Sequence, residues 1–217
     1  MSQIKQQVLA KMCEAGVVAV IRAKSKDQLV GITTALLEGG VPSIEVTMST
    51  PNAIEGIAQL AAKFGDRAIV GVGTVLDAAT ARQAIAAGAQ FVVSPITDPD
   101  MIATTLEAGK VCIPGAFTPT EIYRAYKLGA DVVKVFPSTS LGPTFFKDIL
   151  APLPQLKLTP TGGVDQKNAG AWIKAGAVCV GAGSSLVSKD ALAKNDWSAI
   201  AWAAKTFVDA IKQARAS

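Results

Sequence analysis

A lysine lies in the middle of an apolar run that reads as a buried β-strand, in the stretch DVVKVFPS from Asp131 to Ser138. Burying a lysine ammonium without a partner is costly, so an inward lysine in an apolar pocket has its charged form disfavoured and its pKa lowered. The neutral amine can then attack a carbonyl carbon and form a Schiff base, an electron sink that allows an adjacent C–C bond to break. Lys134 is therefore the first candidate catalytic residue.

The partner of this amine must be a group other than histidine, because the sequence contains none. That excludes a Ser-His-Asp or Cys-His nucleophile and a histidine-ligated metal. A general base must be Glu, Asp, Lys, Tyr or water. Glu45, in SIEVTM, is the candidate proton shuttle, since desolvation would raise its pKa toward neutrality. Such chemistry requires no metal and no cofactor.

A repeated pattern predicts the elements that carry these residues. Six times, a helix-like segment is followed by a glycine and a short β-rich run, as in EAGVVAVI and KLGADVVKVF. A glycine there is typical of a helix C′ position in the left-handed conformation. The glycines are Gly16, Gly40, Gly88, Gly109, Gly129 and Gly176.

With two further β-rich runs, the pattern predicts eight strands that alternate with helices. Alternation implies a parallel sheet with right-handed crossovers, and eight units in about 200 residues fit a (β/α)8 TIM barrel. An open doubly wound sheet is the alternative. Additional helices are predicted at the N-terminus, about 2–14, and the C-terminus, about 190–215. No linker divides the chain, so residues 1–217 are predicted to form one domain. The predicted strands are 17–22, 43–48, 68–73, 90–94, 111–114, 131–136, 156–161 and 177–181.

Strand alternation predicts which side chains face the barrel interior. Glu45 and Lys134 share the inward side of the second and sixth strands, and Arg22 lies inward at the end of the first. The same parity places Lys157, with Thr159 and Thr161, inside the seventh strand. The alternatives are a buried Glu–Lys pair without chemistry and a register slip that exposes either residue.

Glycine-rich loops predict an anion site at the ends of the seventh and eighth strands. Gly162 and Gly163 lie in TPTGGVD, and Gly183 and Ser184 lie in VGAGSSL. In such barrels these loops often bind phosphate through backbone N–H groups. Gly73 and Thr74 offer further donors for a carboxylate, or form a plain turn. Pro95 either forms a wall of the site or ends the fourth strand.

Composition favours a globular protein with a small anionic ligand. Half of the 217 residues are hydrophobic and 18% are charged. The net charge of +4 comes from scattered residues, which argues against a nucleic-acid groove and suits an anionic metabolite. The sequence has no run of about 18 apolar residues and no apolar secretion signal, so we expect no membrane partner and a cytoplasmic location.

Seven motifs together resemble the KDPG/KHG aldolase family, the class I 2-keto-3-deoxy-6-phosphogluconate aldolases. The resemblance implies a (β/α)8 barrel, a homotrimer, and cleavage of a phosphorylated 2-keto-3-deoxy sugar acid to pyruvate and glyceraldehyde 3-phosphate. It also implies roles for individual residues. These are Lys134 as the Schiff-base lysine, Glu45 as the acid/base, Thr74 and Gly73 at the pyruvate carboxylate, Pro95 and Phe136 as apolar walls, Arg22 near the keto acid, and Thr161, Gly162, Gly163 and Ser184 at the phosphate end. The motifs are EVTMSTP, GVGTVL, FVVSP, IPGAFTPTE, KVFPS, PTGGV and GAGSSLV.

One position departs from the pattern of this family. Many members read EVTLRT, with an arginine where this chain has Ser49. Arg22 is the candidate to supply the missing charge, and a polar residue at 49 is also similar to the 6-phosphogalactonate branch of the family. The preferred epimer, and activity on 4-hydroxy-2-oxoglutarate, therefore stay open. A phosphate-binding barrel isomerase or epimerase and a non-catalytic sugar-phosphate-binding subunit are the remaining alternatives.

Overall fold

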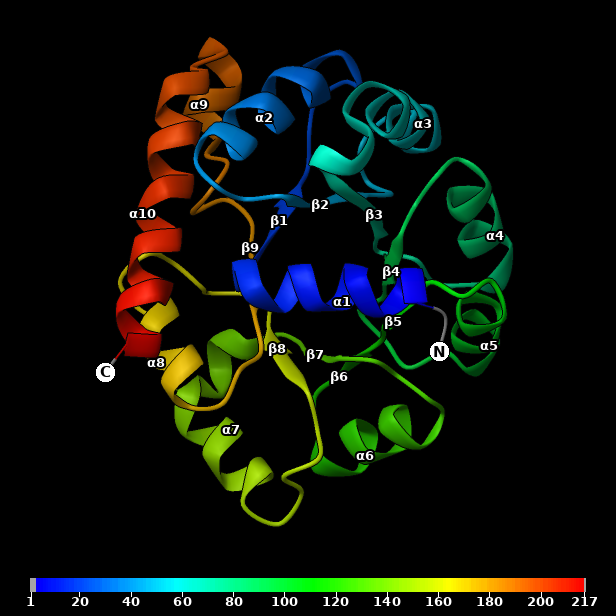
Figure 1. Ribbon diagram of the computed structural model, residues 1–217. Coiled ribbons are helices and arrows are strands. Elements are labelled where there is room, and N and C mark those ends of the chain that lie inside the picture. The colour runs from blue at the N-terminus through cyan, green and yellow to red at the C-terminus, as the bar shows by residue number, and fades with distance from the viewer. Residues whose placement is uncertain (1–2, 217) are drawn as a thin grey trace.

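The computed structural model describes residues 3–216, and its strands follow one another round a closed ring (Figure 1). All strand pairs are parallel. Six strands run in the order β5-β4-β3-β2-β1-β9 and three in the order β6-β7-β8. Single bridges, Leu158 to Ala177 and Thr161 to Gly181, join β8 to the β9 segment, and Pro114 alone separates β5 from β6. The predicted (β/α)8 barrel is confirmed. The strands are β1 (Val17–Ile21), β2 (Ser43–Thr47), β3 (Ile69–Gly73), β4 (Phe91–Val93), β5 (Val111–Ile113), β6 (Gly115–Ala116), β7 (Val133–Val135), β8 (Leu158–Pro160) and β9 (Val180–Ala182).

Helices surround this ring, and the N-terminal helix α1 (Gln3–Ala15) crosses one end of it (Figure 1). The predicted start of that helix at residue 2 lies outside the described residues. Among residues 3–216, no helix is both long and apolar enough to span a membrane. The outer helices are α2 (Asp27–Glu38), α3 (Ala53–Phe64), α4 (Ala78–Ala86), α5 (Pro99–Glu107), α6 (Pro119–Lys127), α7 (Gly142–Leu150), α8 (Ala169–Lys174), α9 (Lys189–Lys194) and α10 (Trp197–Ala216), with 3-10 turns at Gly65–Arg67 and Ser138–Ser140.

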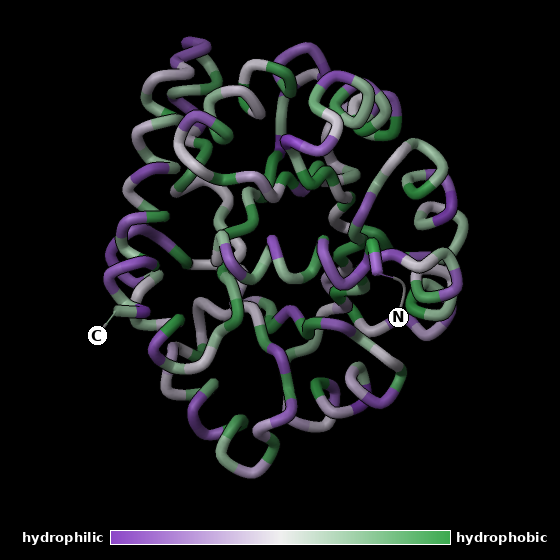
Figure 2. The backbone as a smooth tube through the Cα atoms, viewed as in Figure 1, coloured by the Kyte–Doolittle hydropathy of each residue, from purple (hydrophilic) through white to green (hydrophobic). Residues whose placement is uncertain are grey.

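The apolar side chains divide into two clusters. The larger fills the space between the barrel and the outer helices. The smaller lies inside the barrel, where Phe91 and Val132 meet Leu9 and Met12 of α1. Figure 2 shows hydrophobic segments along the central strands, as burial on both faces of a parallel sheet requires. Helix α1 thus closes one end of the interior and leaves the other end for a site.

A buried ion pair fixes α1 to the barrel. Lys5 Nζ lies 2.8 Å from a carboxylate oxygen of Asp131, and both side chains are almost fully buried. The same carboxylate oxygen accepts a hydrogen bond from the Cys112 backbone N–H at 2.8 Å. The carboxylate therefore connects α1 to β5, and through its own residue to the segment that leads into β7.

The predicted glycine pattern is confirmed, because all six glycines have a positive φ, between 66° and 107°. Two predictions about the C-terminal part are wrong. The helix predicted at 190–215 is divided into α9 and α10 at Asn195, whose φ of 50° is left-handed and cannot continue a helix. The last strand spans Val180–Ala182 rather than 177–181, and Ala177 forms only an isolated bridge.

Candidate active site

Lys134 projects from β7 into the barrel and is 4% exposed. Its Nζ lies 4.8 Å from the centre of the Phe136 ring. Among residues 3–216, no carboxylate oxygen lies within 4.0 Å of this nitrogen. Burial lowers the pKa of Lys134 below its ordinary value, the Glu45 carboxylate partly opposes this, and the Arg22 guanidinium adds to the lowering. The amine is thus placed to be uncharged and nucleophilic.

Glu45 projects inward from β2 and is 3% exposed. Burial raises the pKa of its carboxyl group, and the cations of Lys134 and Arg22 oppose that rise. The carboxyl group occupies space that a side chain at Gly73 would take, since a Cβ there would lie 1.9 Å from Oε1 of Glu45. Gly73, predicted as a backbone donor, therefore has an additional steric reason to be glycine.

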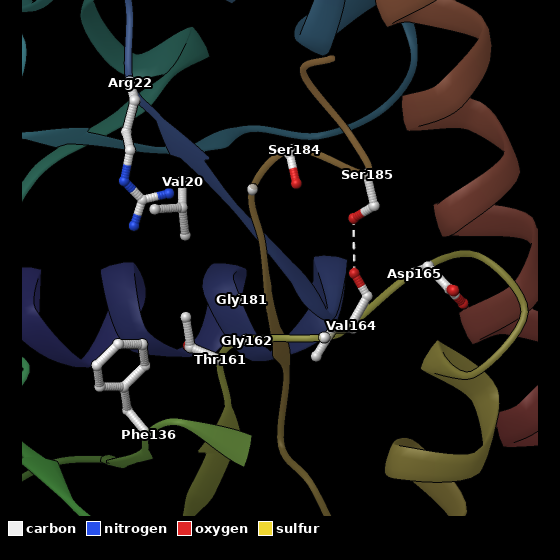
Figure 3. A pocket seen from close by; sticks show the side chains of 12 residues that line it. Val20, Arg22, Phe136, Thr161, Gly162, Val164, Asp165, Gly181, Ser184 and Ser185 are labelled. Carbon is white, nitrogen blue, oxygen red and sulfur yellow. Dashed lines mark hydrogen bonds between the residues drawn. The ribbon is translucent and has the colours of Figure 1, made fainter. Parts of the chain in front are cut away.

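A cavity of about 280 Å³ brings together seven of the predicted residues. It opens at the carboxyl ends of the strands, where the loops after β1, β8 and β9 meet (Figure 3). Sequence reasoning gave no role at the site to Val164, Asp165 and Ser185, although they lie within or beside the TPTGGVD and VGAGSSL loops, and the cavity is also lined by Val20 and Gly181. The predicted residues that line the cavity are Arg22, Phe136, Thr161, Gly162, Gly163, Gly183 and Ser184.

Arg22 follows the last residue of β1, and its side chain is exposed to the cavity. Figure 3 shows the guanidinium extending toward the side on which Phe136 and Thr161 lie. A Cβ at Gly183 would lie 3.3 Å from one guanidinium nitrogen, so this glycine leaves room for the arginine. No acidic side chain of residues 3–216 forms an ion pair with Arg22. The cation is available to an anionic ligand.

The two glycine loops form one unit. Gly162 and Gly163 have φ values of 97° and 71°, which turn the backbone after β8 sharply. Ser185 Oγ donates to the carbonyl of Val164 at 2.6 Å, so the loop after β9 is fixed to the loop after β8 (Figure 3). Ser184 points its hydroxyl toward the same space (Figure 3). The arrangement offers backbone and hydroxyl donors to a ligand in the same cavity as Arg22.

Five of the predicted residues do not line this cavity: Lys134, Glu45, Gly73, Thr74 and Pro95. Pro95 lines a neighbouring cavity of about 260 Å³. Its backbone lies so close to Gly115 of β6 that a Cβ at Gly115 would overlap it. Phe136 lines both cavities, and its ring is the one that Lys134 contacts. Thr74, directly after β3, has a left-handed φ of 62° and lines neither cavity.

One inward prediction fails. Lys157 is exposed at the start of the β8 segment, near Leu9 of α1, although Thr159 and Thr161 of the same parity are buried. Lys157 therefore lies at the end of the barrel opposite the site. Parity predicted the direction of its side chain but not its depth along the barrel axis.

Known proteins resemble this chain over most of its length. A family model described as KDPG and KHG aldolase matches residues 8–203. The 2-dehydro-3-deoxy-phosphogluconate aldolase of Treponema pallidum is 38% identical over 185 residues, covering 85% of this chain and 88% of that protein. The 2-dehydro-3-deoxy-6-phosphogalactonate aldolase of Escherichia coli K12 is 31% identical, covering 78% of this chain and 83% of that protein.

A solved structure agrees with these sequence matches. The KDPG aldolase of Legionella pneumophila, with pyruvate captured as a covalent carbinolamine intermediate, is 30% identical and superposes with a TM-score of 0.86 over 93% of this chain and 98% of that one. The fold, the inward lysine and the extent of the matches lead to one conclusion. The chain belongs to the KDPG and KHG aldolase family.

Proposed function

We propose that this protein is a class I aldolase that cleaves 2-dehydro-3-deoxy-6-phosphogluconate to pyruvate and glyceraldehyde 3-phosphate. The observation that carries the proposal is the buried amine of Lys134, whose pKa burial lowers, together with the buried carboxyl group of Glu45, which interacts with it electrostatically. The adjoining cavity, with its free cation and glycine loops, suits a phosphorylated acid. The curated relative and the pyruvate-bound relative support the same reaction.

The proposed mechanism balances with these two side chains and water. The Lys134 amine attacks the C2 ketone, and Glu45, directly or through a water molecule, protonates the departing hydroxyl group, which gives an iminium ion and water. Glu45 then removes the proton of the C4 hydroxyl group while the C3–C4 bond breaks and its electrons pass to the iminium. Glyceraldehyde 3-phosphate leaves. The resulting enamine takes a proton at C3, and water releases pyruvate and restores the amine.

Substrate contacts follow from the same arrangement. We assign the phosphate end to Thr161, Gly162, Gly163, Gly183 and Ser184, whose loops present N–H and hydroxyl donors. Arg22 supplies the positive charge for an anionic group of the substrate. Following the family resemblance, we assign the pyruvate carboxylate to Gly73 and Thr74, and the apolar walls of the pyruvyl group to Pro95 and Phe136.

Borohydride trapping tests the covalent step. Reduction in the presence of pyruvate should attach a stable adduct to the peptide that contains Lys134, and Lys134→Met should abolish both the adduct and pyruvate release. Lys157→Met is the matched control. Lys157 precedes the neighbouring strand β8, has the alternation of the inward residues, and is exposed at the other end of the barrel. An adduct on another lysine rejects the proposal. Turnover retained in Lys134→Met would favour a non-covalent isomerase or epimerase.

A second candidate substrate is the 6-phosphogalactonate epimer. The polar Ser49 and the similarity to the Escherichia coli 6-phosphogalactonate aldolase favour it. Pyruvate release should be compared side by side with both phosphorylated epimers and with 4-hydroxy-2-oxoglutarate. Tight binding of a phosphorylated keto acid without any pyruvate release would instead favour a non-catalytic sugar-phosphate-binding subunit.

We also propose that the protein is a homotrimer. Three apolar side chains are exposed on the loops after β3, β4 and β6: Leu76 (52%), Ile96 (48%) and Phe117 (37%). Neighbouring exposed apolar groups of this kind are typical of a surface that another chain covers. Light scattering should give the mass of three chains, and Ile96→Glu should lower it. Trp202→Glu, on the exposed side of α10, is the control that should leave the mass unchanged. A monomeric wild-type protein would contradict the proposal.

A further inference from the structure

The segment that follows β2 contacts the backbone on both sides of Arg22. Thr47 Oγ1 donates to the carbonyl of Ile21 at 2.9 Å, and the backbone N–H of Ala23 donates to Thr50 Oγ1 at 3.2 Å. Both threonines are buried. Arg22 lies between these two anchored residues, so its backbone is restrained on each side while its guanidinium extends into the cavity.

These contacts extend the strand pairing past its normal end. The backbone register between β1 and β2 stops at Ile21 opposite Val46. Beyond this pair, the threonine hydroxyl groups bond the Ile21 carbonyl and the Ala23 N–H, in place of further backbone pairing between the strands. An unsatisfied buried N–H or carbonyl group is costly, so each hydroxyl group favours this path of the chain at Arg22.

The Thr47 hydroxyl group also contacts the hydroxyl group of Ser49. The two hydroxyl oxygens lie 2.8 Å apart. A threonine hydroxyl group has one hydrogen, and Thr47 gives it to Ile21, so Ser49 must be the donor of this pair. The Thr50 backbone N–H donates to the Thr47 carbonyl at 2.9 Å and closes the turn. The three hydroxyl residues thus form one connected network.

We propose that Thr47, Ser49 and Thr50 form a hydroxyl clamp that positions Arg22 for the anionic substrate. This inference rests on the proposed aldolase function. An arginine side chain has many rotamers, and Arg22 has no acidic partner within residues 3–216 to restrain it. A fixed backbone lowers the entropy that substrate binding must remove. Many members of the family have an arginine at position 49. This chain has Ser49 there, which supports Arg22 from the end of another strand.

Thr50→Val is the sharpest test, because Thr50 lies farther along the chain from Glu45 than Thr47 does. The change keeps the side-chain shape but removes the acceptor for Ala23 N–H. We expect KM for the phosphorylated substrate to rise by about three- to tenfold, the equivalent of one hydrogen bond, with a smaller change in kcat. Thr50→Ser should restore KM. Thr105→Val is the matched control. Its buried hydroxyl group also bonds the backbone, donating to the carbonyl of Met101 far from the site, and both constants should stay at the wild-type values.

A double-mutant cycle with Arg22→Ala separates positioning from a general structural effect. If Thr50 acts through Arg22, Thr50→Val should raise KM in the wild-type background and add almost nothing in the Arg22→Ala background. An equal rise in both backgrounds, or no rise in either, overturns the clamp. These outcomes are measured on a protein that releases pyruvate. A wild-type protein that neither releases nor traps pyruvate would reject the aldolase function instead.

Discussion

Gly73→Ala should disable Glu45 while leaving the barrel folded. An alanine Cβ at this position would lie 1.9 Å from Oε1 of Glu45, 2.6 Å from Cδ and 2.7 Å from Cγ, whereas real Cβ atoms essentially never approach a heavy atom closer than 3.0 Å. The carboxyl group must therefore move by at least 1.1 Å. The φ of Gly73 is not left-handed, so alanine fits the backbone without strain.

The expected loss is in the rate rather than in the stability. A displacement of about 1 Å in a reacting group can lower a rate by roughly 100-fold, which corresponds to about 2.7 kcal/mol of activation free energy. The free energy of unfolding should change by less than about 1 kcal/mol, because the displaced atoms end a flexible side chain and alanine reduces the entropy of the unfolded chain.

Gly71→Ala provides the matched comparison. Gly71 faces the same side of β3, two residues earlier, but a Cβ there would lie 2.4 Å from the ring of Phe91 in the interior core. Overpacking of this kind costs about 1–3 kcal/mol. Gly71→Ala should therefore lose stability and retain most of its kcat, which is the opposite of Gly73→Ala.

Three measurements decide the matter: kcat for pyruvate release, the rate of borohydride trapping with pyruvate, and unfolding in urea. Gly73→Ala should be slow in the first two and close to wild type in the third. The reasoning is refuted if Gly73→Ala keeps its kcat within about threefold of wild type. It is also refuted if Gly73→Ala is destabilised as much as Gly71→Ala, since the glycine would then serve packing alone.

Two further predictions concern charge. Glu45→Gln should lower the pKa of Lys134, because it removes the carboxylate that raises that pKa, whereas Arg22→Ala should raise it, because it removes a cation that lowers it. The pH of half-maximal borohydride trapping should therefore shift in opposite directions in the two variants. Shifts of the same sign would contradict the assignment. Asp131→Asn should reduce the free energy of unfolding by about 3 kcal/mol, because the buried ammonium of Lys5 loses its carboxylate partner. The double variant Lys5→Met/Asp131→Asn should recover part of that loss in urea unfolding, and a double variant no more stable than Asp131→Asn would argue against the ion pair.

The repeating architecture was predictable because it depends on local physics. A helix that ends in a left-handed residue favours glycine, and the short run after it can only be a strand if it is apolar and β-branched. Helix starts depend on equally local contacts where a side chain caps them. Asp77, Asp98 and Thr118 each accept a hydrogen bond from the backbone N–H three residues later, and Thr118 completes a capping box with Glu121.

The C-terminal part was less predictable because its signals are not local. The residues from Trp197 onward continue a helical pattern that α9 already shows, and nothing in the pattern indicates that Asn195 is left-handed. The last strand begins later in the sequence than the position of Gly176 suggests, because Ala177 pairs with β8 only through a single bridge. Tertiary pairing, rather than propensity, determines where that strand begins.

The sequence predicted which side chains of the site face the barrel interior, but not the hydrogen bonds that hold them in place. Period-two alternation placed Glu45 and Lys134 inside the barrel, and both are buried. The hydroxyl groups around Arg22 were not predicted, because Thr47 and Thr50 meet Ile21 and Ala23 only after two loops approach each other. A polar residue near a strand end has many possible partners in sequence, and the fold selects one.

Depth along the barrel axis distinguishes Lys134, the proposed nucleophile, from Lys157. Lys134 pairs in register with Thr159, and Lys157 lies two residues before Thr159 on the same side of its strand, so parity alone treats the two lysines alike. Lys157 is exposed at the end of the barrel that α1 covers. Lys134 lies further along the barrel, where burial and the Arg22 cation both disfavour its charged form. Helix α1 makes this difference. It closes the end of the interior at which the strands begin with apolar residues, and it leaves the carboxyl ends of the strands to the polar site. An amine in this barrel becomes reactive only where the apolar interior ends and the cavity for the substrate begins.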